Sequence, residues 1–210
     1  MCTRVVYSGK NGMVATGRSM DWKTEMHSNL WVFPKGMERN GETGANSLKW
    51  TSKYGSVVTS AFEIASTDGM NEKGLVANLL WLPETEYPVR DQSKPGLAIT
   101  AWVQYMLDNF ATVDEAVAFI DETTFQVVSD LMPDGSRLAT LHLSISDATS
   151  DCAIFEYTGG KLTVYHSKEY KVMTNSPTYN KQLALNEYWK SIGGLSFRPG
   201  TNRPSDRFAR

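Results

Sequence analysis

The sequence predicts an α+β fold in which helices pack against antiparallel sheets, and three observations support this. The chain has 210 residues, a length typical of one domain. Its predicted strands follow one another through short turns rich in Gly, Asn and Asp, which is typical of antiparallel hairpins. The predicted helices are grouped and do not alternate singly with strands, which argues against repeated βαβ units. We therefore expect residues 1–210 to form a single domain.

The first third of the chain is predicted to be mostly strand. Residues 2–17 contain two apolar runs around a turn with Asn11-Gly12, which indicates a hairpin. Clusters of Gly, Asn and Asp then separate four further strand candidates, at residues 30–33, 48–53, 54–62 and 75–82.

Two helices are expected in the middle of the chain. Pro95 is expected to begin a helix that runs through Met106, and Thr112 with Glu115 has the spacing of a capping box before a second helix at 113–120. Beyond them the sequence predicts strands at 139–146, 152–157 and 162–166 and a last helix at 178–192, before two glycines.

Composition excludes several classes of protein. Hydrophobic residues make up 41% and charged residues 21%, which is typical of a globular chain and not of a disordered one. Lys and Arg number 21 and Asp and Glu 23, so the net charge is 21 − 23 = −2, with no long block of like charge. The longest mostly apolar stretch, 75–82, is far shorter than the ~20 residues that a membrane span needs. We expect a soluble protein without a nucleic-acid or membrane partner.

Targeting and metal signals are weak. Residues 1–20 lack the features of a secretion signal, so the chain as written is expected to be cytoplasmic, or periplasmic if a signal peptide once preceded it. Cys2 and Cys152 are too few for a disulfide framework and show no CxxC spacing, so no metal site is expected. Cys152 lies in an apolar strand and is interpreted as a buried, unreactive thiol. His142 lies on an alternating strand and receives no role.

Cys2 is the main candidate for chemistry. It follows the initiator methionine and is small enough for that methionine to be removed, which makes Cys2 the N-terminal residue. One residue then carries a thiol nucleophile beside an α-amine that serves as general base, a recognised variant of the catalytic triad. The alternative is a cysteine of an early strand without a catalytic role.

Arg18 and Asp21 follow in the segment GRSMDW, directly after the second strand of the hairpin that begins at Cys2. A hairpin brings its partner strand close, and an arginine beside a thiol favours the thiolate. Asp21 could hold the α-amine through a charge-assisted hydrogen bond. A surface ion pair between Arg18 and Asp21, worth ~0 to 1 kcal/mol, is the alternative.

Five segments occur in a characteristic order: MCTR at the start, GRSMDW, DGMNEKGL at 68–75, TNSPTY at 174–179 and DRFAR at the end. Together they resemble the choloylglycine hydrolase family, whose N-terminal-nucleophile amidases include penicillin V acylases and bile salt hydrolases. The resemblance implies a four-layer αββα sandwich of antiparallel sheets. Family members continue well past DRFAR, so residues 1–210 are expected to lack the C-terminal part of that fold.

The resemblance also implies roles for individual residues. It implies Cys2 as nucleophile and base, Arg18 beside the thiol, Asp21 on the α-amine, Asn175 as a side-chain donor to the oxyanion, and Arg207 as a second arginine near the nucleophile. Loss of one oxyanion donor typically lowers the rate by ~10² to 10³. A turn role for Asn175 before Ser-Pro, and a solvated terminal charge for Arg207, remain open.

Trp81 occupies the position where bile salt hydrolases carry an asparagine. Its backbone N–H could still serve as the second oxyanion donor, which needs no particular side chain. The indoles of Trp81 and Trp22 would give flat apolar walls that suit an aromatic or long-chain acyl group. This resembles the Gram-negative-type penicillin V acylase branch, whose members also cleave acyl homoserine lactones. Burial of both tryptophans in the core is the alternative.

We therefore expect a hydrolase of linear amides that acts through an acyl-thioester on Cys2 and needs no metal or organic cofactor. Its partner is a small-molecule amide substrate, and the resemblance leaves room for a homo-oligomer. Two alternatives stay open. One is a bile salt hydrolase, and the other is a non-catalytic relative that binds acyl ligands.

Overall fold

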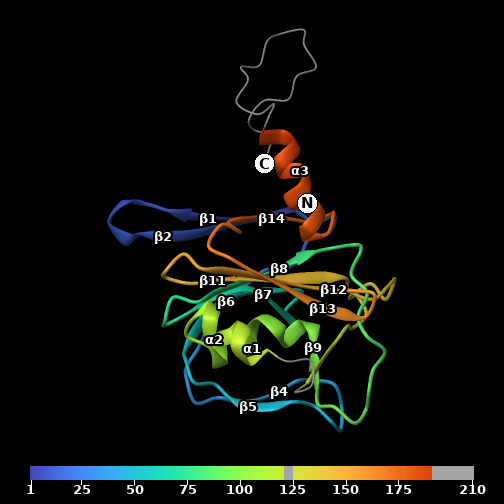
Figure 1. Ribbon diagram of the computed structural model, residues 1–210. Helices are drawn as coiled ribbons and strands as arrows, with labels where there is room; N and C mark the ends of the chain where they lie inside the picture. The colour runs from blue at the N-terminus through green and yellow to red at the C-terminus, as the bar shows by residue number, and fades with distance from the viewer. Residues whose placement is uncertain (121–124, 191–210) are drawn as a thin grey trace.

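The computed structural model describes residues 1–120 and 125–190, and a prediction that falls on other positions lies outside the described residues. Two antiparallel sheets are stacked face to face (Figure 1). Helices α1 and α2 cover the outer face of the larger sheet, and α3 rises from the far side of the smaller one (Figure 1). The α+β class and the layered antiparallel sheets are thus confirmed.

The smaller sheet has the order β14-β1-β2 and contains the start of the chain. Strands β1 (Cys2–Ser8) and β2 (Val14–Met20) form the predicted hairpin, with Cys2 opposite Met20 and Arg4 opposite Arg18. The 3₁₀ turn Lys10–Gly12 joins them, and Asn11 has a φ of 60° there, a conformation that Asn tolerates well. Strand β14 (Val172–Thr174) pairs with the other edge of β1 and was not predicted.

The larger sheet has seven strands in the order β13-β12-β11-β8-β7-β6-β3. Their neighbours are antiparallel throughout, as the hairpin turns predict. In sequence order these strands are β3 (Leu30–Phe33), β6 (Ser56–Ala61), β7 (Ala65–Asn71), β8 (Val76–Trp81), β11 (Leu141–Ser146), β12 (Cys152–Thr158) and β13 (Lys161–His166).

The first two helices are shorter than predicted, and positions 191–192 of the predicted last helix lie outside the described residues. The expected helix at 95–106 begins instead as strand β9 (Gly96–Ala98) and a 3₁₀ turn (Ile99–Ala101), and α1 covers Trp102–Asn109. Helix α2 (Val113–Phe119) has the expected N-cap, because the Thr112 side chain accepts from Glu115 N. The remaining elements are the β4 (Glu38–Asn40) and β5 (Lys49–Thr51) pair, β10 (Gln126–Val128), which runs parallel to β9, and α3 (Tyr179–Lys190).

The main core lies between the larger sheet and helix α1. Trp102, Met106 and Leu107 of α1 are essentially inaccessible to solvent. The helix approaches the sheet closely at Gly69 of β7, where a Cβ atom would lie 2.6 Å from Leu107 Cδ1. A residue without a side chain is therefore needed where the helix crosses this strand.

A second, smaller core fills the space between the two sheets. It contains Cys2 of β1, Met173 of β14, Leu80 of β8, Ile154 of β12 and Tyr179 at the start of α3. Because both sheets contribute apolar side chains, Cys2 is held between them and is only 5% exposed. The stacking of the sheets therefore places the candidate nucleophile at a fixed and mostly dry position.

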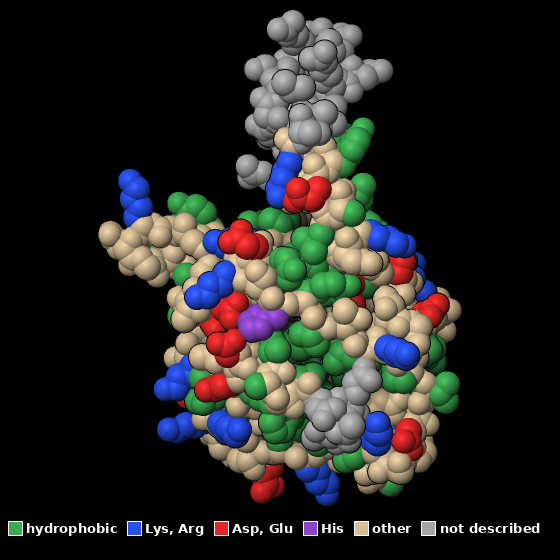
Figure 2. All heavy atoms as spheres, viewed as in Figure 1, with side chains coloured by type: hydrophobic (Ala, Val, Ile, Leu, Met, Phe, Trp, Pro, Cys, Tyr) green, Lys and Arg blue, Asp and Glu red, His purple; other side chains and the backbone are tan. Residues whose placement is uncertain are grey.

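Charged side chains of both signs are spread over the face seen in Figure 2, in keeping with the net charge of −2. Hydrophobic side chains also reach the surface along α3, where Leu185 and Tyr188 are exposed. Within the described ranges, no helix has the length and apolar character to span a membrane.

Candidate active site

Cys2 and Arg18 meet between the two sheets. They lie on neighbouring strands of the hairpin, and Arg18 Nη2 is 3.8 Å from Cys2 Sγ. Arg18 belongs to β2, which continues to Met20, and does not follow the strand as the sequence suggested. Arg18 therefore donates a hydrogen bond to the sulfur of the candidate nucleophile.

Asp68 fixes the orientation of Arg18. Its carboxylate lies 2.5 Å from Arg18 Nη1, while Arg18 Nη2 donates to the carbonyl oxygen of Leu79 at 2.6 Å. Asn78 donates to the other oxygen of Asp68 at 2.9 Å. Burial raises the pKa of Asp68, and the positive charge of Arg18 and the hydrogen bond from Asn78 oppose that shift. The surface ion pair between Arg18 and Asp21 is therefore wrong, because Arg18 pairs with Asp68.

Asp21 lies next to the start of the chain. The ammonium group of Met1 donates to the backbone oxygen of Asp21 at 2.7 Å and lies 3.3 Å from its carboxylate. With Met1 attached, the nitrogen of Cys2 is a peptide nitrogen, so the contact predicted between Asp21 and the Cys2 α-amine stays a prediction. In this structure Asp21 nevertheless forms an ion pair with the ammonium group at the start of the chain.

Asn175 lies directly beside Cys2, as the resemblance implied. Its Oδ1 accepts the backbone N–H of Cys2 at 2.6 Å, and its Nδ2 donates to the carbonyl oxygen of Trp81 at 2.7 Å. Asn175 is 5% exposed. It directly follows β14, so it is not only a turn residue before Ser176 but a buried link between β14, β1 and β8.

The end of β8 presents backbone groups to this site. Trp81 is opposite Leu141 of β11, and Leu82 N donates to Thr140 O, so the pair of Trp81 and Leu141 is a non-hydrogen-bonded one. The N–H and C=O of Trp81 consequently point away from β11. On that side β7 pairs with β8 only as far as Asn78. The Trp81 N–H is thus directed to the side where its C=O meets Asn175.

An apolar pocket of about 110 Å³ opens beside Cys2. Trp22 and Trp81 both line it, and their rings make an edge-to-face contact with centroids 5.9 Å apart. Trp81 Nε1 donates to Thr140 Oγ1 at 3.0 Å, which fixes the plane of its indole. The two tryptophans therefore form a wall of the pocket and are not simply core residues. Further apolar side chains, among them Ile64 and Leu141, also line it.

Gln182 and Glu156 support the site and were missed by the sequence analysis. Gln182 Nε2 donates to the carbonyl oxygens of Pro177 and Asn175, at 2.6 and 3.1 Å. Glu156 accepts the Tyr179 N–H at the first residue of α3 and also bonds His142 Nδ1 at 2.8 Å. His142 is thus fully buried in a pair with Glu156. Polar residues at ordinary strand and helix positions gave no sequence signal for these contacts.

The remaining predicted residues can be placed briefly. Arg207 lies outside the described residues. Cys152 is buried and unpaired, and burial raises the pKa of its thiol, which agrees with an unreactive cysteine.

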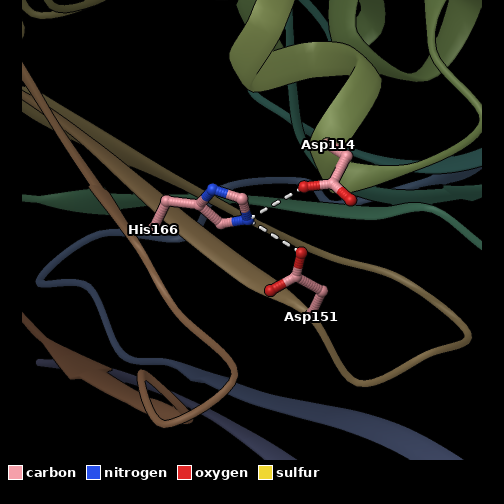
Figure 3. Close-up of side chains that lie close together, drawn as sticks. All are labelled: Asp114, Asp151 and His166. Carbon is pink, nitrogen blue, oxygen red and sulfur yellow. Dashed lines mark hydrogen bonds and ion pairs between the residues drawn. The ribbon is translucent and has the colours of Figure 1, made fainter.

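A separate cluster joins α2 to the β12–β13 hairpin (Figure 3). His166 Nε2 lies 2.8 Å from the carboxylate of Asp151 and 3.4 Å from that of Asp114. None of the three side chains lines the pocket beside Cys2.

Comparison with known proteins agrees with this geometry. The family model described as linear amide C-N hydrolases, choloylglycine hydrolase family, matches residues 2–210. The penicillin V acylase of Pectobacterium atrosepticum is 53% identical over 100% of this chain and 58% of its own length. The solved penicillin V acylase of Agrobacterium tumefaciens superimposes with a TM-score of 0.88 at 59% identity, over 100% of this chain and 63% of that one. A bile salt hydrolase/transferase of Bifidobacterium longum is 27% identical over 86% of this chain and 56% of its own.

These matches extend over 86% or more of this chain, whereas the chain spans less than two thirds of the length of each of these relatives. The chain therefore belongs to the linear amide C–N hydrolases of the choloylglycine hydrolase family.

Proposed function

We propose that the protein hydrolyses linear amides with Cys2 as an N-terminal nucleophile. The observation that carries the proposal is the meeting of three groups at one point: the Cys2 thiol, the Arg18 guanidinium at 3.8 Å and the Asn175 side chain at 2.6 Å from Cys2 N. An apolar pocket opens directly beside them. A nucleophile, a group that stabilises its anion, a hydrogen-bond donor and a binding pocket are the parts that acyl transfer requires.

The reaction begins once Met1 has been removed. The Cys2 sulfur attacks the amide carbonyl, and the Cys2 α-amine takes the thiol proton and passes it to the departing amine nitrogen as the C–N bond breaks. This leaves an acyl-thioester on Cys2. The same amine then accepts a proton from water, whose oxygen attacks the thioester, and the carboxylic acid leaves as the thiol is regenerated. The cycle uses only groups of the chain and one water molecule.

The oxyanion of each tetrahedral intermediate is stabilised by Asn175 Nδ2 and the backbone N–H of Trp81. Two features support this pair. Asn175 is held at Cys2 by a hydrogen bond, and β8 directs the Trp81 N–H away from β11 to the side where Asn175 lies. Donors that are already in position cost little reorganisation when the negative charge forms.

The substrates proposed are amides with an aromatic or long-chain acyl group, including penicillin V and acyl homoserine lactones. The aromatic wall formed by Trp22 and Trp81 supports this class, because flat rings pack well against phenoxy groups and alkyl chains. The high identity to two penicillin V acylases supports it further. The 27% identity to a bile salt hydrolase/transferase makes conjugated bile salts the second candidate.

The test uses the protein at its full natural length. Intact mass spectrometry should show Met1 absent from active preparations, because an acylated nitrogen cannot act as the base. We expect hydrolysis of penicillin V and of a long-chain acyl homoserine lactone to exceed that of a taurine-conjugated bile salt. Cys2→Ala should abolish the reaction, and Cys152→Ala serves as the matched control that retains it. Activity with Met1 retained, or in Cys2→Ala, would refute the mechanism, and preferential bile salt turnover would refute the substrate class.

A further inference from the structure

Three side chains with metal-binding atoms meet between α2 and the β12–β13 hairpin (Figure 3). His166 is the last residue of β13, Asp151 directly precedes β12, and Asp114 lies in the first turn of α2. One imidazole nitrogen and one oxygen of each carboxylate all lie within 4.8 Å of one another. Among the residues that the structure describes, this is the one group of three or more His, Cys, Asp or Glu side chains with that property. Three separate elements thus direct three potential ligands to one point.

The separations between these atoms suit a tetrahedral metal ion. Zn²⁺ binds imidazole nitrogen and carboxylate oxygen at ~2.0 to 2.2 Å, so two ligand atoms of a tetrahedral site lie about 3.4 Å apart. His166 Nε2 is 3.4 Å from the Asp114 carboxylate and 2.8 Å from that of Asp151. The side chains of Asp114 and His166 are 82% and 31% exposed, so both can adjust, and an ion can reach them from solvent.

Hydrogen bonds outside the group hold the two aspartates in place. Asp151 Oδ1 accepts the N–H of the next residue at 2.9 Å, which leaves Oδ2 directed to His166. Asp147 connects the two aspartates, because its Oδ2 accepts the N–H of the residue before Asp114 at 3.0 Å and its Oδ1 accepts the N–H of Asp151 at 3.3 Å. Metal ligands in proteins are commonly oriented by such a second layer of hydrogen bonds. The positions of both carboxylates are therefore fixed before an ion binds.

The charges and the ligand types favour one class of ion. Two carboxylates share a single imidazole, which can offset at most one of their two negative charges, whereas a divalent cation offsets both. The imidazole distinguishes this group from an ordinary acidic surface patch. Nitrogen ligands favour Zn²⁺ and similar transition ions, while Mg²⁺ and Ca²⁺ prefer oxygen ligands. A set of one imidazole nitrogen and two carboxylate oxygens thus fits Zn²⁺.

We propose that Asp114, Asp151 and His166 bind one Zn²⁺ ion, with a water molecule as fourth ligand, and that the ion fastens α2 to the β12–β13 hairpin. The site is structural, because none of its ligands lines the pocket beside Cys2. It is therefore independent of the proposed amidase function. The three ligands are far apart in sequence, so no short motif of the kind that usually indicates a zinc site is present.

The test titrates Zn²⁺ into the full-length protein with Cys2→Ala, which removes a thiol that can also bind zinc. Bound metal is first removed with a chelator. Isothermal titration calorimetry should show saturable binding, and Zn²⁺ at ~100 times its Kd should raise Tm by about 5 °C, because an ion that binds only the folded state stabilises it. Mg²⁺ at the same concentration should neither raise Tm nor compete with Zn²⁺.

Two substitutions remove ligands. His166→Gln should weaken Zn²⁺ binding by more than ~100-fold, since even the loss of a group that only orients a ligand costs ~10- to 100-fold. Asp114→Asn should weaken it at least ~10-fold, and its exposed position makes this substitution compatible with folding. In both variants the rise in Tm at the same Zn²⁺ concentration should shrink in proportion to the lost occupancy.

His27→Asn is the matched control. His27 lies 3.8 Å from the single carboxylate of Glu25, and both side chains are exposed, so this pair lacks the second carboxylate of the proposed site. Asparagine tolerates the positive φ of 46° at this position. The Zn²⁺ affinity and the rise in Tm should therefore be the same in His27→Asn as in the parent.

Three results would overturn the proposal: no saturable Zn²⁺ binding in the parent, an unaltered Kd in His166→Gln, or an equal loss of affinity in His27→Asn. Each would leave the three side chains as ion pairs alone. If His166→Gln failed to fold, Asp114→Asn would decide, because an unaltered Kd in that variant also overturns the site. Displacement of Zn²⁺ by an equal concentration of Mg²⁺ would contradict an imidazole ligand.

Discussion

The side-chain oxygen of Asn175 lies 2.6 Å from the backbone nitrogen of Cys2, although 173 positions separate them. The contact exists because β14 pairs with β1, so the residue that follows β14 reaches the beginning of β1. Thr174 Oγ1 adds a hydrogen bond to Cys2 O at 3.0 Å. The candidate nucleophile is therefore fixed from both sides, by β2 through Arg18 and by β14 through Asn175.

Substitution of Asn175 tests the proposed oxyanion donor. Asn175→Ala should lower kcat for penicillin V by ~10² to 10³, because one preorganised donor is lost. Asn175→Asp removes the donor as well but keeps an oxygen that accepts from Cys2 N, so it should be nearly as slow. Steady-state kinetics on the two variants measures this. A loss below tenfold in both would remove Asn175 from the mechanism.

The pair formed by Arg18 and Asp68 makes a prediction about stability. Their side chains are 9% and 17% exposed, so loss of one partner leaves a mostly buried charge alone. Asp68→Ala should reduce the free energy of unfolding by about 3 kcal/mol, towards the lower end of the range for broken buried pairs. It should also lower kcat, because Arg18 loses the carboxylate that directs it to Cys2. Urea unfolding and kinetics provide the two measurements.

Lys23 and Asp134 offer the matched control for that experiment. They also form an ion pair, at 3.9 Å, but their side chains are 70% and 51% exposed. Asp134→Ala should therefore change the free energy of unfolding by less than about 1 kcal/mol. Equal effects of the two substitutions would contradict the view that burial makes the Asp68 contact important.

Much of the fold could be predicted from local patterns, and one missed strand shows why the rest could not. The hairpin of β1 and β2, the strands β8, β11, β12 and β13 and the cap of α2 all have strong local signals. Strand β7 has the sequence ASTDGMN, which is polar, contains glycine and has low strand propensity. It is extended because β6 and β8 flank it, and its Gly69 is required by the approach of Leu107. Tertiary contacts, not propensity, determine that strand.

In the candidate site, too, some residues have a local sequence signal and others are placed only by tertiary contacts. Cys2, Arg18 and Asn175 could be predicted because their neighbours in sequence form recognisable segments. Asp68 belongs to such a segment as well, but its contact with Arg18 depends on the register of β7 against β8, where it lies opposite Asn78. Gln182 is one polar residue among several on α3. Its hydrogen bonds to the carbonyl oxygens of Asn175 and Pro177 depend on how the loop before α3 folds, which the sequence does not show.

Gln182 is expected to act by positioning Asn175. Its Nε2 bonds Pro177 O and Asn175 O, and its Oε1 accepts Thr174 N at 3.1 Å. Gln182→Leu removes every one of these bonds and should lower kcat by about 10- to 100-fold with a smaller effect on KM, because small displacements of a reacting group are costly. Gln182→Glu keeps one acceptor and should be slower than the parent for the same reason.

The control for Gln182 lies on the same helix. Glu187 is exposed on α3 and forms an ion pair with Lys190, so Glu187→Gln should leave kcat unaltered. If Gln182→Leu lowered the free energy of unfolding without changing kcat, its role would be structural alone. Circular dichroism melting of all three variants distinguishes the two outcomes.

Asp147 provides a prediction about pH. It lies in the turn between β11 and β12, where its Oδ2 accepts the N–H of Val113, the first residue of α2, and its Oδ1 accepts the N–H of Thr149. Burial alone acts to raise its pKa, but the hydrogen bonds from Val113 and Thr149 outweigh burial and lower the pKa overall. The folded state thus favours the carboxylate more than the unfolded chain does.

The sign of the pH effect follows from that direction. Because the folded pKa is depressed, the stabilisation is fully present above the unfolded value of ~3.9 and is lost as pH falls through the folded value. Asp147→Asn should therefore lower the free energy of unfolding at neutral pH, and the two proteins should converge in stability as the pH falls through the depressed pKa of the folded state. Urea unfolding at a series of pH values measures the difference.

Glu25→Gln, at a side chain that is 81% exposed, is the control and should show no such convergence. A difference between Asp147→Asn and the parent that stayed constant from neutral to acid pH would show that the carboxylate charge does not stabilise the start of α2.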